Sequence, residues 1–252
     1  MNIFKLMIPL LAFGTFAAAA SDEPEAIKQM EKQGIRIIGP IDVPGGLKGW
    51  LGDYQGTGVT LYLTPDGKHA ISGYMYDEKG KNLSESVINE KLYVPAGREM
   101  WKKLQSVPGV TEGSDKAGCH VVVFADPFCP YCRTFYQQVE PAIRNNSLQI
   151  KTLLVGILKP ESGQYAAGIL SAANPSQAWR DFENSPGVTR PDLPEIPPRH
   201  IFDQIHNNQN LMQELGANGT PAIYYMSSDK KLQQITGLPD KEQMADLQKC
   251  HQ

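Results

Sequence analysis

Two cysteines three residues apart lie where a predicted strand gives way to a predicted helix. Residues 120–124 read His-Val-Val-Val-Phe, a continuous run typical of a strand that is buried on both faces. A helical pattern begins at Pro130, and Cys129 and Cys132 flank its first turn. Proline is favoured at the first position of a helix, so we expect Cys129 to be the N-cap residue. The sequence therefore predicts an α/β layer with a sulfur pair at a helix N-terminus.

This position predicts a reactive thiolate at Cys129. The free N–H groups and the positive end of the helix dipole stabilise an anion at the N-cap. A free cysteine has a pKa of about 8.5, and helix N-termini and Cys-x-x-Cys motifs lower it to about 3.5–7.5. A shift of about 3 units favours the thiolate by about 4 kcal/mol and makes the disulfide more oxidising. We expect Cys129 to attack a substrate sulfur and Cys132, facing the core, to resolve the mixed disulfide.

Three other roles for the pair agree less well with the sequence. A zinc site would need Cys119 or His120 as further ligands, but no second cysteine pair has the required spacing. Attachment of c-type haem needs a histidine after the second cysteine, where Arg133 stands. An inert structural disulfide would not need this strand-to-helix position. We expect no metal and no small-molecule cofactor, only the redox-active disulfide.

The first 20 residues predict an export signal. Lys5, an apolar run over 6–16 and four alanines at 17–20 match the three regions of a cleaved signal peptide. The apolar run is shorter than the about 20 residues that span a bilayer. Export to the periplasm would place the cysteines where disulfides persist. The formal net charge of −3 does not indicate the basic surface that nucleic-acid-binding proteins usually have, so we expect no nucleic acid as a partner.

The mature chain divides into two predicted domains and a connecting segment. Residues 21–81 predict a small α+β domain with a helix at 24–33 and strands that include 58–63 and 70–76. Such a small core is marginal alone, which favours oligomerisation. Alternation of Thr60 and Tyr62 with apolar neighbours indicates a sheet with one solvated face. The glycine-rich stretch 45–49 indicates a turn.

The connecting segment and the second domain complete the chain. Residues 82–111 predict a helical linker, with a helix over 98–107. Residues 112–252 predict the α/β domain, which carries a helical insertion at about 160–215. Five prolines make the stretch 186–198 a loop, and a helix is expected at 207–215.

Two motifs of the second domain carry a resemblance. Phe-Ala-Asp-Pro-Phe-Cys-Pro-Tyr-Cys at 124–132 and Gly-Thr-Pro-Ala-Ile-Tyr-Tyr-Met at 219–226 resemble the thioredoxin-like domain of the bacterial periplasmic DsbC/DsbG disulfide isomerase family. Proline as the second residue of the centre is similar to the DsbG branch, since the DsbC branch carries glycine there. Segments 58–76 and 95–101 agree as well, so the resemblance covers essentially the whole mature chain.

The resemblance implies a V-shaped homodimer of thiol–disulfide oxidoreductases. Each chain would have a cystatin-like N-terminal dimerisation domain, a helical linker and a thioredoxin-like catalytic domain. It implies that Pro221 is cis beside the cysteine pair and that Thr220 presents its backbone to the substrate, and we expect Pro130 and Tyr131 to contact substrate too. The implied partners are misfolded or sulfenylated periplasmic proteins and the membrane reductase DsbD.

The activity implied is that of a disulfide isomerase and reductase with chaperone-like binding of its substrates. Two alternatives stay open at this point. One is a net dithiol oxidase of the DsbA kind. The other is a chaperone-type binding module whose thiols are secondary.

Three residues outside the pair have weaker signals. Asp126, three residues before Cys129, is a candidate proton relay to Cys132, although a strand-end turn with Pro127 is the simpler and favoured explanation. Cys119 and Cys250 lie outside the family pattern. A thioredoxin-like layout brings both to the end of the central strand opposite the active centre, so we expect a structural disulfide worth about 2–4 kcal/mol. The alternative is one buried thiol and one terminal thiol.

Overall fold

The computed structural model describes residues 23–185 and 190–250, so the predicted signal segment, residues 1–20, lies outside the described residues. The chain divides into two compact units, the first ending at Ala96 and the second beginning at Gly97. Within the described ranges, no helix combines the length and the apolar character needed to cross a membrane.

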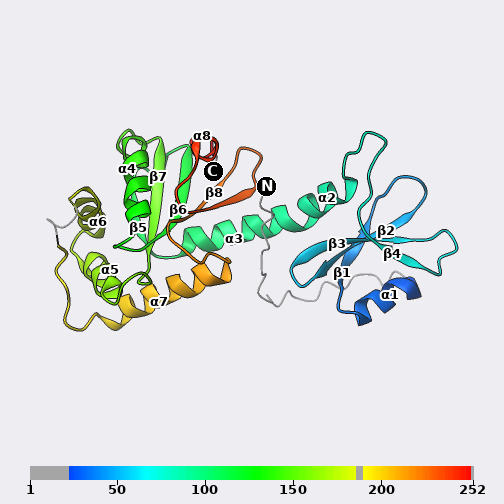
Figure 1. Ribbon diagram of the computed structural model, residues 1–252, viewed down its shortest axis with the longest axis horizontal. Coiled ribbons are helices and arrows are strands. Elements are labelled where there is room, and N and C mark those ends of the chain that lie inside the picture. The colour runs from blue at the N-terminus through cyan, green and yellow to red at the C-terminus, as the bar shows by residue number, and fades with distance from the viewer. Residues whose placement is uncertain (1–22, 186–189, 251–252) are drawn as a thin grey trace. The chain divides into compact units, whose positions relative to one another are not determined.

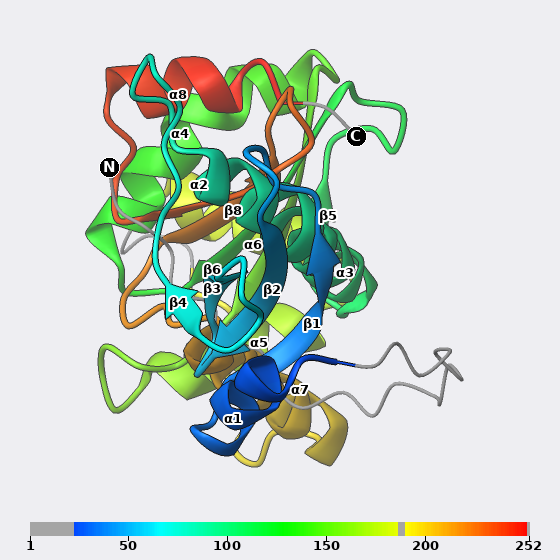
Figure 2. The same cartoon turned by 90° about the vertical axis from the view of Figure 1, so that its right-hand side faces the viewer.

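The first unit is an antiparallel sheet with helices on both faces. Ile27 packs with Trp50 and Leu61 where the first helix lies across one end of the sheet (Figure 2). Ile88 packs with Leu51 on the opposite face. The elements, whose four strands pair in chain order, are α1 (Glu25–Lys32), β1 (Arg36–Ile41), β2 (Lys48–Tyr54), β3 (Thr57–Leu63), β4 (Ala70–Ser72), α2 (Leu83–Ile88) and the π-helical turn η1 (Asn89–Tyr93).

The sequence pattern does not predict strand β2 and indicates only a turn at 45–49. Gly49 and Gly52 interrupt its apolar pattern, but the packing requires both of them. A Cβ at Gly49 would lie 2.7 Å from Cγ1 of Val43, and one at Gly52 would lie 2.6 Å from Cγ2 of Ile35. Neighbouring side chains therefore occupy the space that a larger residue would need, and a period-two pattern cannot reveal such a strand.

The prediction that one face of β3 is solvated is wrong. Thr60 and Tyr62 are only 1% and 7% exposed, because α2 covers this face of the strand. The hydroxyl of Ser84 on α2 lies 3.0 Å from Oγ1 of Thr60 and 2.5 Å from Oη of Tyr62. The polar residues of β3 form a buried hydrogen-bonded cluster, which produces the same sequence alternation as a wet face.

The second unit is built on a mixed five-stranded sheet of order β5-β7-β6-β8-β9. Its central strand, β6, pairs parallel with β7 and antiparallel with β8. The strands are β5 (Val110–Glu112), β6 (Cys119–Ala125), β7 (Leu148–Leu154), β8 (Ala222–Met226) and β9 (Leu232–Thr236). The helices are α3 (Val94–Ser106), α4 (Pro130–Arg144), α5 (Ser162–Ser171), α6 (Pro175–Asn184), α7 (Arg199–Glu214) and α8 (Lys241–Leu247).

Helices cover both faces of this sheet (Figure 1). Phe135 of α4 packs on one face with Val121 and Val123, whereas Val122 and Phe124 point to the face covered by α3 and α7. The helical insertion consists of α5, α6 and α7, the last of which is longer than the helix expected at 207–215. Residues 190–198 contain no helix or strand, while 186–189 lie outside the described residues.

The strand register brings three segments to one edge of the sheet. Ala125 at the end of β6 pairs with Leu154 at the end of β7. Phe124 pairs with Ala222 at the start of β8, because these two strands are antiparallel. The turn before α4, the loop after β7 and the loop before β8 therefore meet at this edge, where the cysteine pair lies.

Candidate active site

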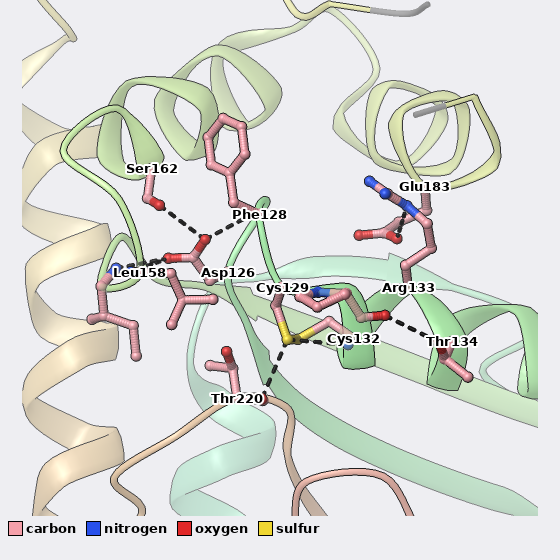
Figure 3. The surroundings of a disulfide bond; sticks show 12 residues. Asp126, Phe128, Cys129, Cys132, Arg133, Thr134, Leu158, Ser162, Glu183 and Thr220 are labelled. Carbon is pink, nitrogen blue, oxygen red and sulfur yellow. Dashed lines mark hydrogen bonds and ion pairs between the residues drawn. A yellow bond between two sulfur atoms is a disulfide. The ribbon is translucent and has the colours of Figure 1, made fainter. Parts of the chain in front are cut away.

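Cys129 occupies the N-cap of α4. Its backbone is extended, with φ −82° and ψ 110°, and Pro130 follows in the first turn of the helix. The N–H of Cys132 donates to Sγ of Cys129 over 3.1 Å (Figure 3). The two residues form a disulfide with their Cα atoms 5.2 Å apart, so the structure is that of the oxidised centre. The helix thus directs backbone N–H groups at the sulfur that we expect to ionise on reduction.

The pair is covered on one side by the loop before β8. Sγ of Cys129 lies 3.2 Å from the carbonyl oxygen of Thr220, and the peptide bond between Thr220 and Pro221 is cis. Both cysteines are only 3% exposed, whereas the intervening Tyr131 is 60% exposed. The structure thus brings the expected redox pair and the expected substrate-contacting residues together at one edge of the sheet.

Asp126 holds the surroundings of the pair in place. Its buried carboxylate accepts four hydrogen bonds, two from the backbone of the loop after β7 and one each from the Phe128 N–H and the Ser162 hydroxyl, at 2.7–3.0 Å. The two loop donors are the N–H groups of Ile157 and Leu158. These bonds join the turn before α4 to the start of the insertion (Figure 3). They support a positioning role for Asp126, while its role as a proton relay stays a prediction.

Two buried carboxylates contact side chains of the first two turns of α4, and the sequence pattern predicts neither. Glu183 of α6 pairs with Arg133, the residue after Cys132, and burial raises the pKa of Glu183 to about 8 although Arg133 opposes the shift. Burial also raises the pKa of Glu112, while hydrogen bonds from Arg180 and Tyr136 oppose that shift. No local signal predicts these contacts, since Glu183 is fifty positions from Arg133 and Glu112 sixty-eight from Arg180.

Cys119 and Cys250 are joined at the opposite end of β6. Their Cα atoms lie 5.1 Å apart, within the usual range for a disulfide, and the sequence separation is 131 residues. Each cysteine is 5% exposed. This second pair is thus well buried and far along the strand from Cys129, and neither of its sulfurs is available as a zinc ligand.

Comparisons with known proteins agree with this geometry. A thioredoxin-like domain model matches residues 110–249, and the model of the disulfide bond isomerase N-terminal domain matches residues 17–85. A solved structure of Proteus mirabilis ScsC, a linker-deletion variant, is 19% identical, with a TM-score of 0.50 over 66% of this chain and 84% of that chain. This last likeness shows the fold alone.

Curated relatives match over most of their length. The thiol:disulfide interchange protein DsbG of Escherichia coli is 50% identical over 93% of this chain and 95% of its own, and DsbG of Pseudomonas aeruginosa is 36% identical over 98% and 96%. DsbC of Escherichia coli is 28% identical over 87% of this chain and 85% of its own. The chain therefore belongs to the DsbG family of thiol:disulfide interchange proteins, which are thiol–disulfide oxidoreductases.

Proposed function

We propose that this chain acts on other proteins in the periplasm as a disulfide isomerase and reductase, with Cys129 as the attacking sulfur and Cys132 as the resolving sulfur. The observation that carries the assignment is the N-cap geometry, in which Sγ of Cys129 accepts the N–H of Cys132 at the start of α4. An anion is stabilised at this sulfur and not at Cys132, which is one turn inside the helix.

The reaction follows from the two positions. In the reduced protein, the Cys129 thiolate attacks one sulfur of a substrate disulfide, and the other substrate sulfur leaves as a thiolate. Cys132 then loses its proton and attacks Sγ of Cys129, which releases the substrate's second thiolate. The substrate gains two electrons and the centre becomes the disulfide seen here. In isomerisation, the freed substrate thiolate instead attacks another substrate disulfide and releases a new thiolate. A substrate thiolate formed in this way attacks the substrate sulfur that is bonded to Cys129, and the Cys129 thiolate leaves with no net electron transfer.

The Cys129 thiolate can also react with a sulfenylated cysteine of a substrate protein. Attack of the Cys129 thiolate on the sulfenic sulfur forms the mixed disulfide, and the hydroxide that leaves takes a proton to become water. Resolution by Cys132 then regenerates the substrate thiol. No metal or small-molecule cofactor is needed, because the sulfur pair carries both electrons. The membrane reductase DsbD would return the centre to the dithiol.

The surroundings of the pair indicate how a protein substrate would be held. Tyr131 presents an exposed aromatic ring beside the reactive sulfur, and Pro130 keeps that turn rigid. The backbone at Thr220 and Pro221 runs within van der Waals reach of Sγ of Cys129, where an extended substrate segment could lie. The match to the isomerase N-terminal domain supports a homodimer, and the segment 1–20 supports export.

Three assays test the assignment. Cys129→Ser should abolish insulin reduction and reshuffling of scrambled ribonuclease, while Cys132→Ala should accumulate substrate proteins as mixed disulfides at Cys129. As matched control, the Cys119→Ala/Cys250→Ala variant should keep both activities if it folds, and circular dichroism checks that. Full activity of Cys129→Ser would contradict the assignment. A centre found mostly oxidised in cells would favour a net oxidase, and suppression of aggregation without any exchange would favour a binding module.

A further inference from the structure

Glu183 is a fully buried carboxylate beside the first turns of α4. Its side chain is 0% exposed, and Oε2 lies 3.4 Å from Nε of Arg133 (Figure 3). Within residues 23–185 and 190–250, neither carboxylate oxygen accepts a hydrogen bond. A buried carboxylate without hydrogen-bond donors is poorly stabilised as an anion, so its charge depends chiefly on Arg133.

The second buried carboxylate, Glu112 on β5, shows the contrast. Its Oε2 accepts a hydrogen bond from Oη of Tyr136 and another from Nε of Arg180, each at 3.0 Å. The charged groups that face Glu183 are Arg133 from α4 and Glu112 from β5, and the negative charge of Glu112 further raises the pKa of Glu183. Of the two carboxylates, Glu183 is therefore the one whose anion has no hydrogen-bond donor, and its pKa is raised to about 8.

Arg133 contacts both groups, since its side chain pairs with Glu183 and its backbone N–H donates to the carbonyl oxygen of Cys129 over 3.3 Å. It follows Cys132 directly, its side chain is 25% exposed, and its guanidinium carbon lies 5.8 Å from the ring centroid of Phe182. A positive charge held in the first turns of α4 adds to the helix dipole and stabilises a thiolate at Cys129. Ionised Glu183 would cancel much of that charge, whereas protonated Glu183 would leave it in full.

We propose that Glu183 is a positioning residue for the redox chemistry, which sets through Arg133 how strongly the Cys129 thiolate is stabilised. This proposal rests on the proposed function of Cys129. Two glutathione thiols reduce the centre to the Cys129 thiolate and the Cys132 thiol, form glutathione disulfide, and leave one proton over. In a fraction of the molecules Glu183 takes up that proton, because the negative charge of the new thiolate makes ionisation of Glu183 less favourable.

The sign of the effect follows from linkage. Below the Glu183 pKa of about 8, Arg133 acts uncancelled and the protein is the stronger oxidant. Above that pKa, ionised Glu183 weakens the thiolate, so the protein gives up its electrons more readily. Replacing Glu183 by glutamine should fix the centre in the more oxidising state at every pH.

The test is the redox equilibrium of the intact protein with glutathione, at about pH 6.5 and about pH 9.5, on either side of the Glu183 pKa. We expect Glu183→Gln to match the unmodified protein at the lower pH and to be about three- to tenfold more oxidising at the higher pH. Arg133→Gln/Glu183→Gln has neither charge, so it should match the unmodified protein at the higher pH and be less oxidising than the unmodified protein at the lower pH. Asp181→Asn removes an acidic group that contacts Gln177 on the same helix, and it should behave like the unmodified protein.

Identical equilibria for Glu183→Gln and the unmodified protein at both pH values would overturn the proposal while leaving the proposed function intact. Failure of the unmodified protein to equilibrate with glutathione would instead contradict the proposed function. If Glu183→Gln does not fold, carbon-13 NMR of the Glu183 carboxyl in the unmodified protein provides the test. Its pKa should be higher in the reduced than in the oxidised protein, and equal values would refute the proposal.

Discussion

The disulfide between Cys119 and Cys250 should stabilise the second unit, and its effect can be measured alone. A protein with Cys129→Ser and Cys132→Ser keeps this one disulfide, so a reducing agent then opens nothing else. The bond closes a loop of 131 residues, for which the chain-entropy relation gives about 5 kcal/mol at room temperature. Measured losses on removing native disulfides are about 2–5 kcal/mol, so we expect a fall in that range.

Urea unfolding provides the assay. Trp101 and Trp179 lie in the core of the second unit, and with Trp50 replaced by phenylalanine the fluorescence reports on that unit. We expect the reducing agent to move the midpoint to lower urea. A control protein that also carries Cys119→Ala and Cys250→Ala should show no response to the reducing agent. An unchanged midpoint in the two-cysteine protein would refute the reasoning.

Three further perturbations have expected outcomes. Asp126→Asn should lower the free energy of unfolding by about 2–3 kcal/mol, because an amide cannot accept all four hydrogen bonds of the carboxylate. Glu183 binds a proton more tightly in the folded than in the unfolded protein, so stability should fall by a few kcal/mol as pH rises from 4.5 to about 8. Glu183→Gln should flatten that pH dependence. Gly52→Ala should destabilise the first unit by about 1–3 kcal/mol, because its Cβ would lie 2.6 Å from Cγ2 of Ile35.

Chemical denaturation measures the free energy of unfolding of all three variants, and for Glu183→Gln and the unmodified protein it is repeated over a series of pH values. Matched controls are Asp181→Asn for the two acidic residues and Gly67→Asn, in an exposed turn with φ 71°, for the glycine. Wild-type stability of Asp126→Asn, an unchanged pH slope in Glu183→Gln, or a neutral Gly52→Ala would each contradict the corresponding contact.

The sequence predicted the parts of the site that depend on local structure. Pro130 and the β-branched run before it located the N-cap of α4 because capping is a property of a few consecutive residues. Strand β2 could not be predicted in this way, because the space beside Gly52 is filled by Ile35, the residue just before β1. The sequence mistook Thr60 for a solvated residue because a partner on α2 is invisible in a period-two pattern.

Contacts between residues far apart in the sequence could not be predicted around the sulfur pair either. The closeness of Asp126 to Cys129 is visible in the sequence, but three of its four hydrogen-bond donors lie more than thirty positions away, on the loop after β7 and at the start of α5. Glu183 was not noticed at all, since nothing in its own helix distinguishes it from a surface glutamate. Long-range polar contacts of this kind appear only once the insertion is packed against α4.

The ionisation of Cys129 tests the central claim most directly. In Cys132→Ser protein the ultraviolet absorbance of the thiolate can be followed against pH, with Cys129→Ser/Cys132→Ser as the blank. Stabilisation by the N-terminus of α4 predicts a pKa for Cys129 well below the about 8.5 of a free cysteine, within the range of about 3.5–7.5 seen at such positions. A pKa at the free-cysteine value would contradict the account.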